Sequence, residues 1–162
     1  MSLKSAFTIV ELIFVIVIIG ILASIAMFKL YYTRDVAKVV TIVTNTQNIL
    51  KDVESYYVSK GEANYKNAKV FEITNVPLYT NSSCNISANN SVFKGTTLYL
   101  CDDTADVLKI TSSTNTPYSI TLTQGSSTSA VNNSLTKNKA FQALTNGTSG
   151  KTYTIGGSLI KQ

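Results

Sequence analysis

An uninterrupted apolar run near the N-terminus constrains this chain more than any other feature. The run LIFVIVIIGILASIAMF, from Leu12 to Phe28, contains no charged side chain. Taken from Phe7, it would extend about 33 Å as an α-helix, enough for a hydrocarbon core of about 30 Å. Lys4 precedes the run, and positive charge favours the cytoplasmic side of such helices. We therefore expect the first residues to stay in the cytoplasm and the chain beyond Lys29 to cross the membrane.

Glu11 is an ionisable residue placed at the start of this apolar segment. A carboxylate in a spanning helix costs about 2.5 kcal/mol or more toward the bilayer centre and less near the interface. It therefore needs a partner, which makes Glu11 a candidate functional residue. The alternative is that its side chain reaches the interface and is solvated there.

Two interpretations of the segment rest on hydropathy alone. A secretory signal peptide would use Lys4 as its charged region, Leu12–Leu22 as its apolar core, and Ser24 and Ala26 as its cleavage site. It would release a secreted soluble binding protein that begins at Met27. Against this, a hydrophobic helical pattern resumes directly beyond the cut. A plain membrane anchor fits the hydropathy but leaves the acidic residue without a role.

A third interpretation comes from a resemblance. The stretch SAFTIVELIFVIVIIGILASIA, which begins at Ser5, resembles the N-terminal processing motif of type IV pilins and type II secretion pseudopilins. The resemblance implies cleavage between Ala6 and Phe7 by a prepilin peptidase, N-methylation of Phe7, and an assembly role for Glu11. The family usually has glycine where Ala6 stands, and it commonly has a helix-breaking proline where Phe28 stands.

The physical logic of this motif lies in two opposite charges. Cleavage leaves an ammonium group on Phe7, one helical turn before Glu11. In a filament whose N-terminal helices form a dry core, Glu11 of one subunit can pair with the Phe7 ammonium of another. An unpaired member of a buried pair costs several kcal/mol, so the pair specifies the axial register of the subunits.

The domain organisation follows from composition and periodicity. No glycine or proline occurs from Ile21 to Lys60, so we expect one helix from near Phe7 to Lys60, with Gly61 as its stop. The predicted parts are a leader (1–6), a transmembrane or filament-core helix (7–29), the amphipathic half of the same helix (30–61) and a head (62–162). The apolar stripe of the amphipathic half consists of Val36, Val39, Val43, Thr46, Leu50, Val53 and Tyr57. The polar residues assigned to the opposite, solvent-facing side are Asp35, Lys38, Asn45, Asn48, Asp52 and Ser55.

A stripe of this length needs a cover, and the sequence beyond Gly61 changes to an alternating pattern typical of strands. The predicted strands are Thr97–Cys101, Val107–Thr111, Tyr118–Thr123, Lys151–Ile155 and Ser158–Lys161, the last two joined by Gly156-Gly157. Two polar tracts are predicted as loops: Glu62–Ser91, with a short strand near Val70–Ile73, and Gln124–Gly150, with a short helix over Ala140–Leu144. The expected fold class is α+β, a long N-terminal helix packed against a small antiparallel sheet, as in pilins.

The chain has two cysteines, Cys84 and Cys101, both in the polar C-terminal part. In an oxidising compartment an even number of cysteines favours a disulfide. Closing a loop of this size stabilises a fold by about 3 kcal/mol. The alternative is a pair of free buried thiols.

The composition argues against catalysis. Histidine is absent, which removes imidazole bases and histidine metal ligands. We find no set of base, nucleophile and orienting residue, and we predict no catalytic residue and no cofactor. Asp102, Asp103 and Asp106 offer oxygen ligands for calcium, but their spacing matches no calcium loop, and a turn is the simpler interpretation. Lys137 and Lys139 are a weak signal for nucleic acid, and a solvated loop explains them better.

The resemblance implies a filament subunit that is held in the bacterial inner membrane with its head in the periplasm before assembly. The implied partners are copies of itself and sibling pilins, a prepilin peptidase, an inner-membrane platform protein, an assembly ATPase and an outer-membrane secretin. The alternative within this class is a minor or tip pilin of a DNA-uptake filament whose head binds a ligand. The resemblance covers roughly the first third of the chain.

Overall fold

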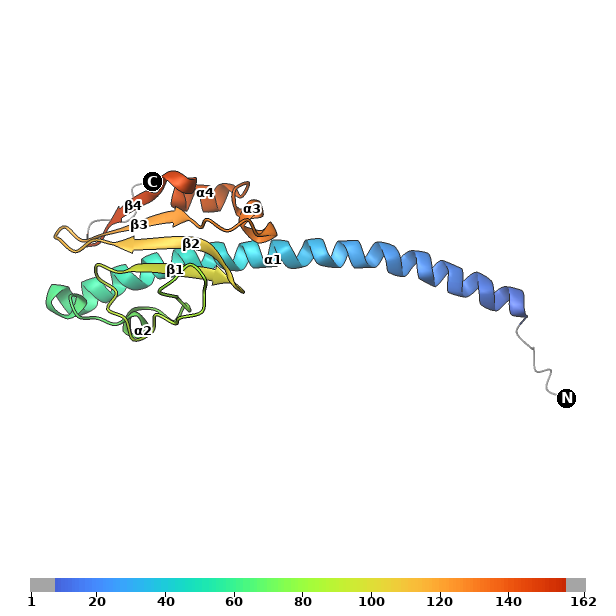
Figure 1. Cartoon of the computed structure of the whole chain (residues 1–162), viewed down its shortest axis with the longest axis horizontal. Helices are drawn as coiled ribbons and strands as arrows, with labels where there is room; N and C mark the ends of the chain where they lie inside the picture. The colour runs from blue at the N-terminus through green and yellow to red at the C-terminus, as the bar shows by residue number, and fades with distance from the viewer. Residues whose placement is uncertain (1–7, 157–162) are drawn as a thin grey trace. The chain divides into compact units, whose positions relative to one another are not determined.

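The computed structural model describes residues 8–156 (Figure 1). The elements are α1 Ile9–Tyr65, α2 Val70–Ile73, β1 Thr97–Asp102, β2 Ala105–Ser112, β3 Ser119–Gln124, α3 Ala130–Leu135, α4 Lys139–Thr145, the 3-10 turn η1 Gly147–Ser149 and β4 Lys151–Thr154. The predicted cleavage site at Ala6 and Phe7 and the predicted strand Ser158–Lys161 lie outside the described residues.

The chain forms two units, Met1–Asp35 and Val36–Gln162, and α1 contributes to both. Within the first unit, Ile9–Met27 has a mean hydropathy of 3.0, and none of it is buried. It is long and apolar enough to cross a membrane. By length and composition, this segment qualifies as a membrane anchor or as a signal sequence.

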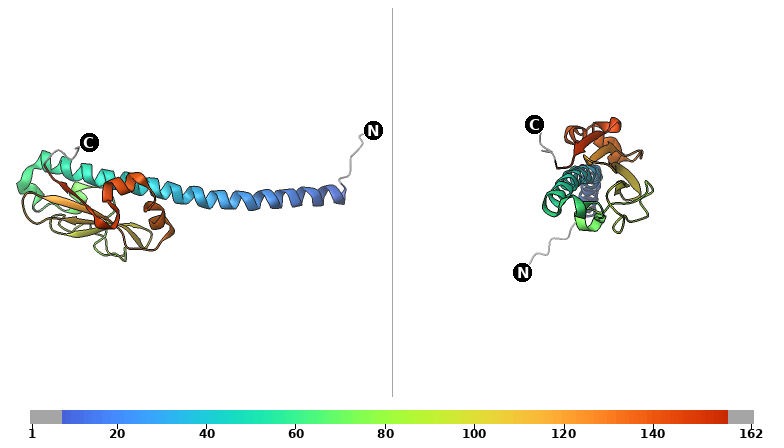
Figure 2. Two further views of the ribbon diagram at one scale, coloured as in Figure 1. Left: turned by 90° about the horizontal axis from the view of Figure 1, so that it is seen from above. Right: turned by 90° about the vertical axis from the view of Figure 1, so that its left-hand side faces the viewer.

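The second unit is an antiparallel sheet in the order β1-β2-β3-β4, packed against the C-terminal part of α1. Viewed along the helix, the sheet lies to one side of α1 (Figure 2). Alternate strand residues point toward the helix and are buried, such as Leu98 and Leu100 of β1, and Ile120 and Leu122 of β3. The α+β class expected from the sequence is confirmed.

The buried side of α1 differs from the predicted stripe in one respect. Val39, Thr46, Leu50 and Val53 are buried as predicted, whereas Val36 is 45% exposed. Ile42 and Ile49, which the predicted stripe left out, are buried as well, and with Val39, Thr46 and Val53 they form a row whose spacing alternates between three and four residues. Both rows have helical periodicity, so periodicity alone did not show where the centre of the buried side lies.

The strand predictions Thr97–Cys101, Val107–Thr111, Tyr118–Thr123 and Lys151–Ile155 are confirmed to within two residues at each end. The short strand predicted at Val70–Ile73 is wrong, because these residues form α2.

A local side-chain contact explains α2. The carboxylate of Glu72 accepts the backbone N–H of Lys69 at 2.7 Å, which closes the first turn of a helix. The β-branched residues Val70 and Ile73 had favoured a strand, but the capping contact and the burial of both side chains outweigh that preference.

Two further differences concern helices. α3 was predicted as loop, because Ser, Thr and Asn dominate that tract. Its N-cap is Ser129, whose hydroxyl accepts the backbone N–H of Asn132 at 3.1 Å. Gly61, at φ 76°, interrupts the helical backbone of α1 as predicted. The helix does not end there, however, because the residues after Gly61 are helical again as far as Tyr65.

The side chain of Tyr65 places an unpaired polar group in this core. It is fully buried between Tyr57, Tyr118 and Phe93, with ring centroids 5.5, 5.3 and 6.4 Å away. Its hydroxyl has no hydrogen-bond partner among the described residues. Burial, with a smaller effect of the neighbouring phenols, raises the pKa of Tyr65 above its usual range.

Tyr65→Phe is therefore expected to stabilise the protein at neutral pH by about 1 kcal/mol, because it removes a buried hydroxyl that has lost its water without gaining a partner. The loss of stability at alkaline pH should also change. Above about pH 10 the unfolded tyrosine ionises while the folded one keeps its proton, so stability falls as pH rises. Urea unfolding of the solubilised chain at pH 7 and pH 11 measures both effects.

Tyr153→Phe is the matched control, because the Tyr153 hydroxyl donates to the Leu144 carbonyl at 2.9 Å. This variant should lose stability at pH 7. The alkaline loss should shrink in Tyr65→Phe without vanishing, since burial also raises the pKa of Tyr118 and Tyr153. Equal destabilisation of both variants at pH 7 would contradict the account.

Candidate functional site

Glu11 lies in the first turn of α1 and makes its contacts with Thr8. Its carboxylate accepts the Thr8 backbone N–H at 2.9 Å and the Thr8 hydroxyl at 2.8 Å. In return, the Glu11 backbone N–H donates to the Thr8 hydroxyl at 3.3 Å. This reciprocal arrangement is a capping box, which satisfies backbone N–H groups that the first turn leaves without partners.

The capping box gives Glu11 a local role that the sequence interpretation did not foresee. The pattern that signals it, threonine followed three residues later by glutamate, is present in the sequence. The predicted partner, the Phe7 ammonium group, lies outside the described residues. The pairing of Glu11 with another subunit therefore stays a prediction, and experiments must separate it from the cap.

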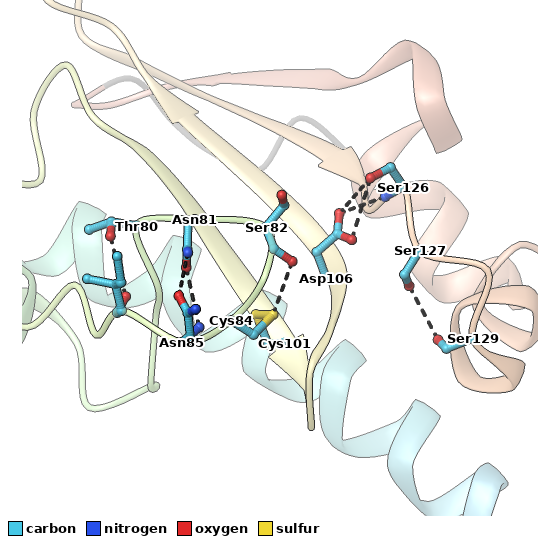
Figure 3. The surroundings of a disulfide bond; sticks show 11 residues. Thr80, Asn81, Ser82, Cys84, Asn85, Cys101, Asp106, Ser126, Ser127 and Ser129 are labelled. Carbon is cyan, nitrogen blue, oxygen red and sulfur yellow. Dashed lines mark hydrogen bonds between the residues drawn. A yellow bond between two sulfur atoms is a disulfide. The ribbon is translucent and has the colours of Figure 1, made fainter.

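The predicted disulfide between Cys84 and Cys101 is confirmed. It joins the loop between α2 and β1 to the strand β1 (Figure 3). The same loop pairs with β1 through reciprocal backbone hydrogen bonds between Tyr79 and Tyr99, at 2.8 and 2.9 Å. The edge of β1 is thus covered by its own chain, covalently and through hydrogen bonds.

The three aspartates considered for calcium have two different partners: Lys38 contacts Asp102 and Asp103, and Ser126 contacts Asp106. Lys38 Nζ lies 2.9 Å from the carboxylate of Asp102 and 3.1 Å from that of Asp103. These contacts, chiefly the hydrogen bond to Asp102, raise the pKa of Lys38. Lys38 had been assigned to the solvent-facing side of the helix, and the structure shows instead that it anchors the β1–β2 turn to α1. Asp103 lies in the turn between β1 and β2, and Asp102 is the last residue of β1 before that turn.

Asp106 is buried on β2 and faces a different element. Its carboxylate accepts the Ser126 backbone N–H at 2.7 Å and the Ser126 hydroxyl at 3.1 Å (Figure 3). Gly125 permits this approach, because a Cβ at that position would lie within 3 Å of the backbone of Asp106 and Val107. Asp106 therefore fastens the end of β3 to β2.

In the part of the chain that the structure describes, no group of three or more His, Cys, Asp or Glu residues could hold a metal ion. Lys137 and Lys139 are both exposed, Lys137 beyond α3 and Lys139 at the start of α4. Their exposure agrees with a solvated surface.

A polar hollow of about 380 Å³ lies between α1 and the segment that follows α2. Its lining consists of Asn45, Asn48, Asp52, Asn75, Val76 and Pro77. The sequence interpretation placed the first three on the solvent-facing side of the helix, since their spacing of three and four puts them on one face. What it missed is the chain segment that lies beside that face.

Thr74 fixes this segment to the helix. Its hydroxyl donates to the carboxylate of Asp52 at 2.6 Å and accepts the backbone N–H of Val76 at 3.2 Å. Thr74 and Val76 are themselves buried. The hydrogen bond from Thr74 to Asp52 therefore holds the segment after α2 against the helix, and the same Asp52 carboxylate lines the hollow.

Comparison of the chain with protein-family models, with curated proteins and with solved structures gave no match.

Proposed function

We propose that this chain is a structural subunit of a type IV pilus-like or type II secretion pseudopilus filament, cleaved by a prepilin peptidase and assembled through its N-terminal helix. The observation that carries the proposal is Glu11, an acidic residue within an otherwise uncharged apolar segment, five positions after a leader-like cleavage pattern. A charge in that setting is functional by default, and a filament core supplies a partner for it.

Two properties of the structure support the proposal. The large apolar side chains of Ile9–Met27 are exposed in the isolated chain, so they require lipid or other helices around them. The second unit is a helix covered by an antiparallel sheet, which is consistent with a pilin-like fold.

In this function the chain is inserted in the bacterial inner membrane with the head in the periplasm. It then moves into a filament with copies of itself or sibling pilins. The processing and assembly partners would be a prepilin peptidase, an inner-membrane platform protein, an ATPase and a secretin. We assign the chain no catalytic role.

Mass spectrometry of the N-terminus tests the processing step. When the chain is expressed together with a prepilin peptidase, we expect a mature form that begins at N-methylated Phe7. Without the peptidase, the leader through Ala6 should remain. The peptidase must cut before the apolar helix, between Ala6 and Phe7, because the mature subunit needs both Glu11 and the helix.

The control is Phe14→Leu, a change within the apolar segment that should leave cleavage unaltered, set against Ala6→Leu, which should block it by removing the small residue. A mature chain that begins at Met27 would instead support a signal peptide and a secreted binding protein, and it would refute the filament proposal.

A further inference from the structure

The polar hollow between α1 and the segment Asn75–Pro77 presents hydrogen-bonding groups that the protein does not use. The side-chain amides of Asn45, Asn48 and Asn75 make no hydrogen bond within the described residues. Each amide has two donors and one acceptor oxygen. Asp52 adds a carboxylate whose Oδ2 accepts from Thr74, which leaves further lone pairs free toward the hollow.

The lining restricts the chemistry of a ligand. Asp52 is its one charged residue, so a phosphate, a carboxylate or a nucleic acid would meet a negative charge and no cation. The lining contains no aromatic ring, so a nucleobase would have nothing to stack on. What remains is a ligand that both donates and accepts many hydrogen bonds, and neutral sugars do so through their hydroxyl groups.

The apolar part of the lining agrees with this chemistry. Val76 and Pro77 are the apolar residues of the lining, and the C–H face of a sugar ring can pack against them while its hydroxyls reach the amides and the carboxylate. The volume of about 380 Å³ lies near the lower end of ligand sites, which span roughly 300–1,000 Å³. Asn48, Asn75 and Pro77 are exposed, so a ligand can enter from solvent.

From this geometry we infer that the hollow lined by Asn45, Asn48, Asp52 and Asn75 is a binding site for a neutral mono- or disaccharide. The inference does not depend on filament assembly, because all of its residues lie in the unit Val36–Gln162. Since the site is open and lacks an aromatic platform, we expect weak binding, with a Kd on the order of 1 mM.

Saturation-transfer difference NMR on the full chain tests the inference. The chain is placed in phospholipid nanodiscs prepared without glycosidic detergent, since a sugar headgroup would occupy the site. The probes are methyl α-glucoside, methyl α-galactoside, N-acetylglucosamine and maltose. At least one of these sugars should receive saturation from the protein, with the strongest transfer to its ring C–H protons. The transfer should reach a plateau as the concentration of that sugar is raised to an excess.

The variants are chosen to leave the fold intact. Asn48→Ala combined with Asn75→Ala removes two exposed amides and should weaken sugar binding at least tenfold. The matched control, Asn90→Ala combined with Asn115→Ala, removes two exposed amides elsewhere and should change nothing. Urea midpoints should agree among all three proteins.

Asp52→Asn distinguishes a sugar from a cation. Asparagine keeps an oxygen to accept the Thr74 hydroxyl but carries no charge, so sugar binding should fall only a few-fold. A site for ammonium groups would instead bind n-butylammonium and lose it in this variant. That result, the absence of saturation transfer to all four sugars, or an equal loss in the control pair would overturn the inference.

Discussion

Replacing Glu11 by glutamine is expected to abolish filament formation while membrane insertion and N-terminal cleavage continue. Filament assembly would bury the Phe7 ammonium group of one subunit against Glu11 of another. Removing one member of a buried ion pair leaves the other charge uncompensated, at a cost of about 3–5 kcal/mol per contact. Because that cost recurs at every subunit added, even the lower figure should reduce the filament yield to background.

Glutamine is chosen because it separates the two roles of Glu11, the ion pair that would set the axial register of the subunits and the capping box with Thr8. Glutamine can take the position of glutamate in a capping box, so the contact with Thr8 survives in this variant. Thr8→Val is the converse: it removes the hydroxyl that contacts Glu11 at 2.8 Å and retains the carboxylate. If assembly depends on the charge, Thr8→Val should form filaments at near-normal yield and Glu11→Gln should not.

The measurement is the amount of sheared filament relative to the cleaved subunit in the membrane. Glu11→Ala and Glu11→Val should behave like Glu11→Gln, since all three lack the charge. Normal filament yield from any of these three would refute the register role. Loss of filaments in Thr8→Val alone would show that the capping box is what assembly requires.

Much of the fold could be predicted because its signals are local and periodic. The alternation around Leu98 and Leu100 and around Ile120 and Leu122 predicts strands with one buried side, and the structure has them. The long run without glycine or proline predicts α1. Where prediction failed, a short-range contact decided the structure, as Glu72 does for α2 and Ser129 for α3.

The candidate site was less predictable, because its residues come together only through tertiary structure. Lys38 and Asp102 are far apart in sequence, and each alone resembles an ordinary solvated charge. The lining of the hollow could not be predicted for the same reason. Nothing in the sequence places the segment after α2, which carries Asn75, beside Asn45 and Asn48 of the helix. The cysteines are the exception, because a chain with only two cysteines has a single possible intramolecular disulfide.

Removing the disulfide should be the largest single loss of stability among changes outside the hydrophobic core. Cys84→Ser combined with Cys101→Ser is expected to lower the free energy of unfolding by about 3 kcal/mol, because the crosslink restricts the unfolded chain over a sequence separation of 17. The hydrogen bonds between Tyr79 and Tyr99 remain in the folded state, so the fold itself should persist. Urea unfolding of the solubilised chain measures the loss.

The slope of that unfolding curve identifies the cause. If the disulfide acts on the unfolded state, the variant unfolds to a more expanded ensemble, so its m-value should rise while its midpoint falls. The single variants Cys84→Ser and Cys101→Ser should each lose as much as the double variant, because either one removes the same crosslink. A lower midpoint with an unchanged m-value would place the effect in the folded state, in the packing of the loop against β1, and would contradict the expected mechanism.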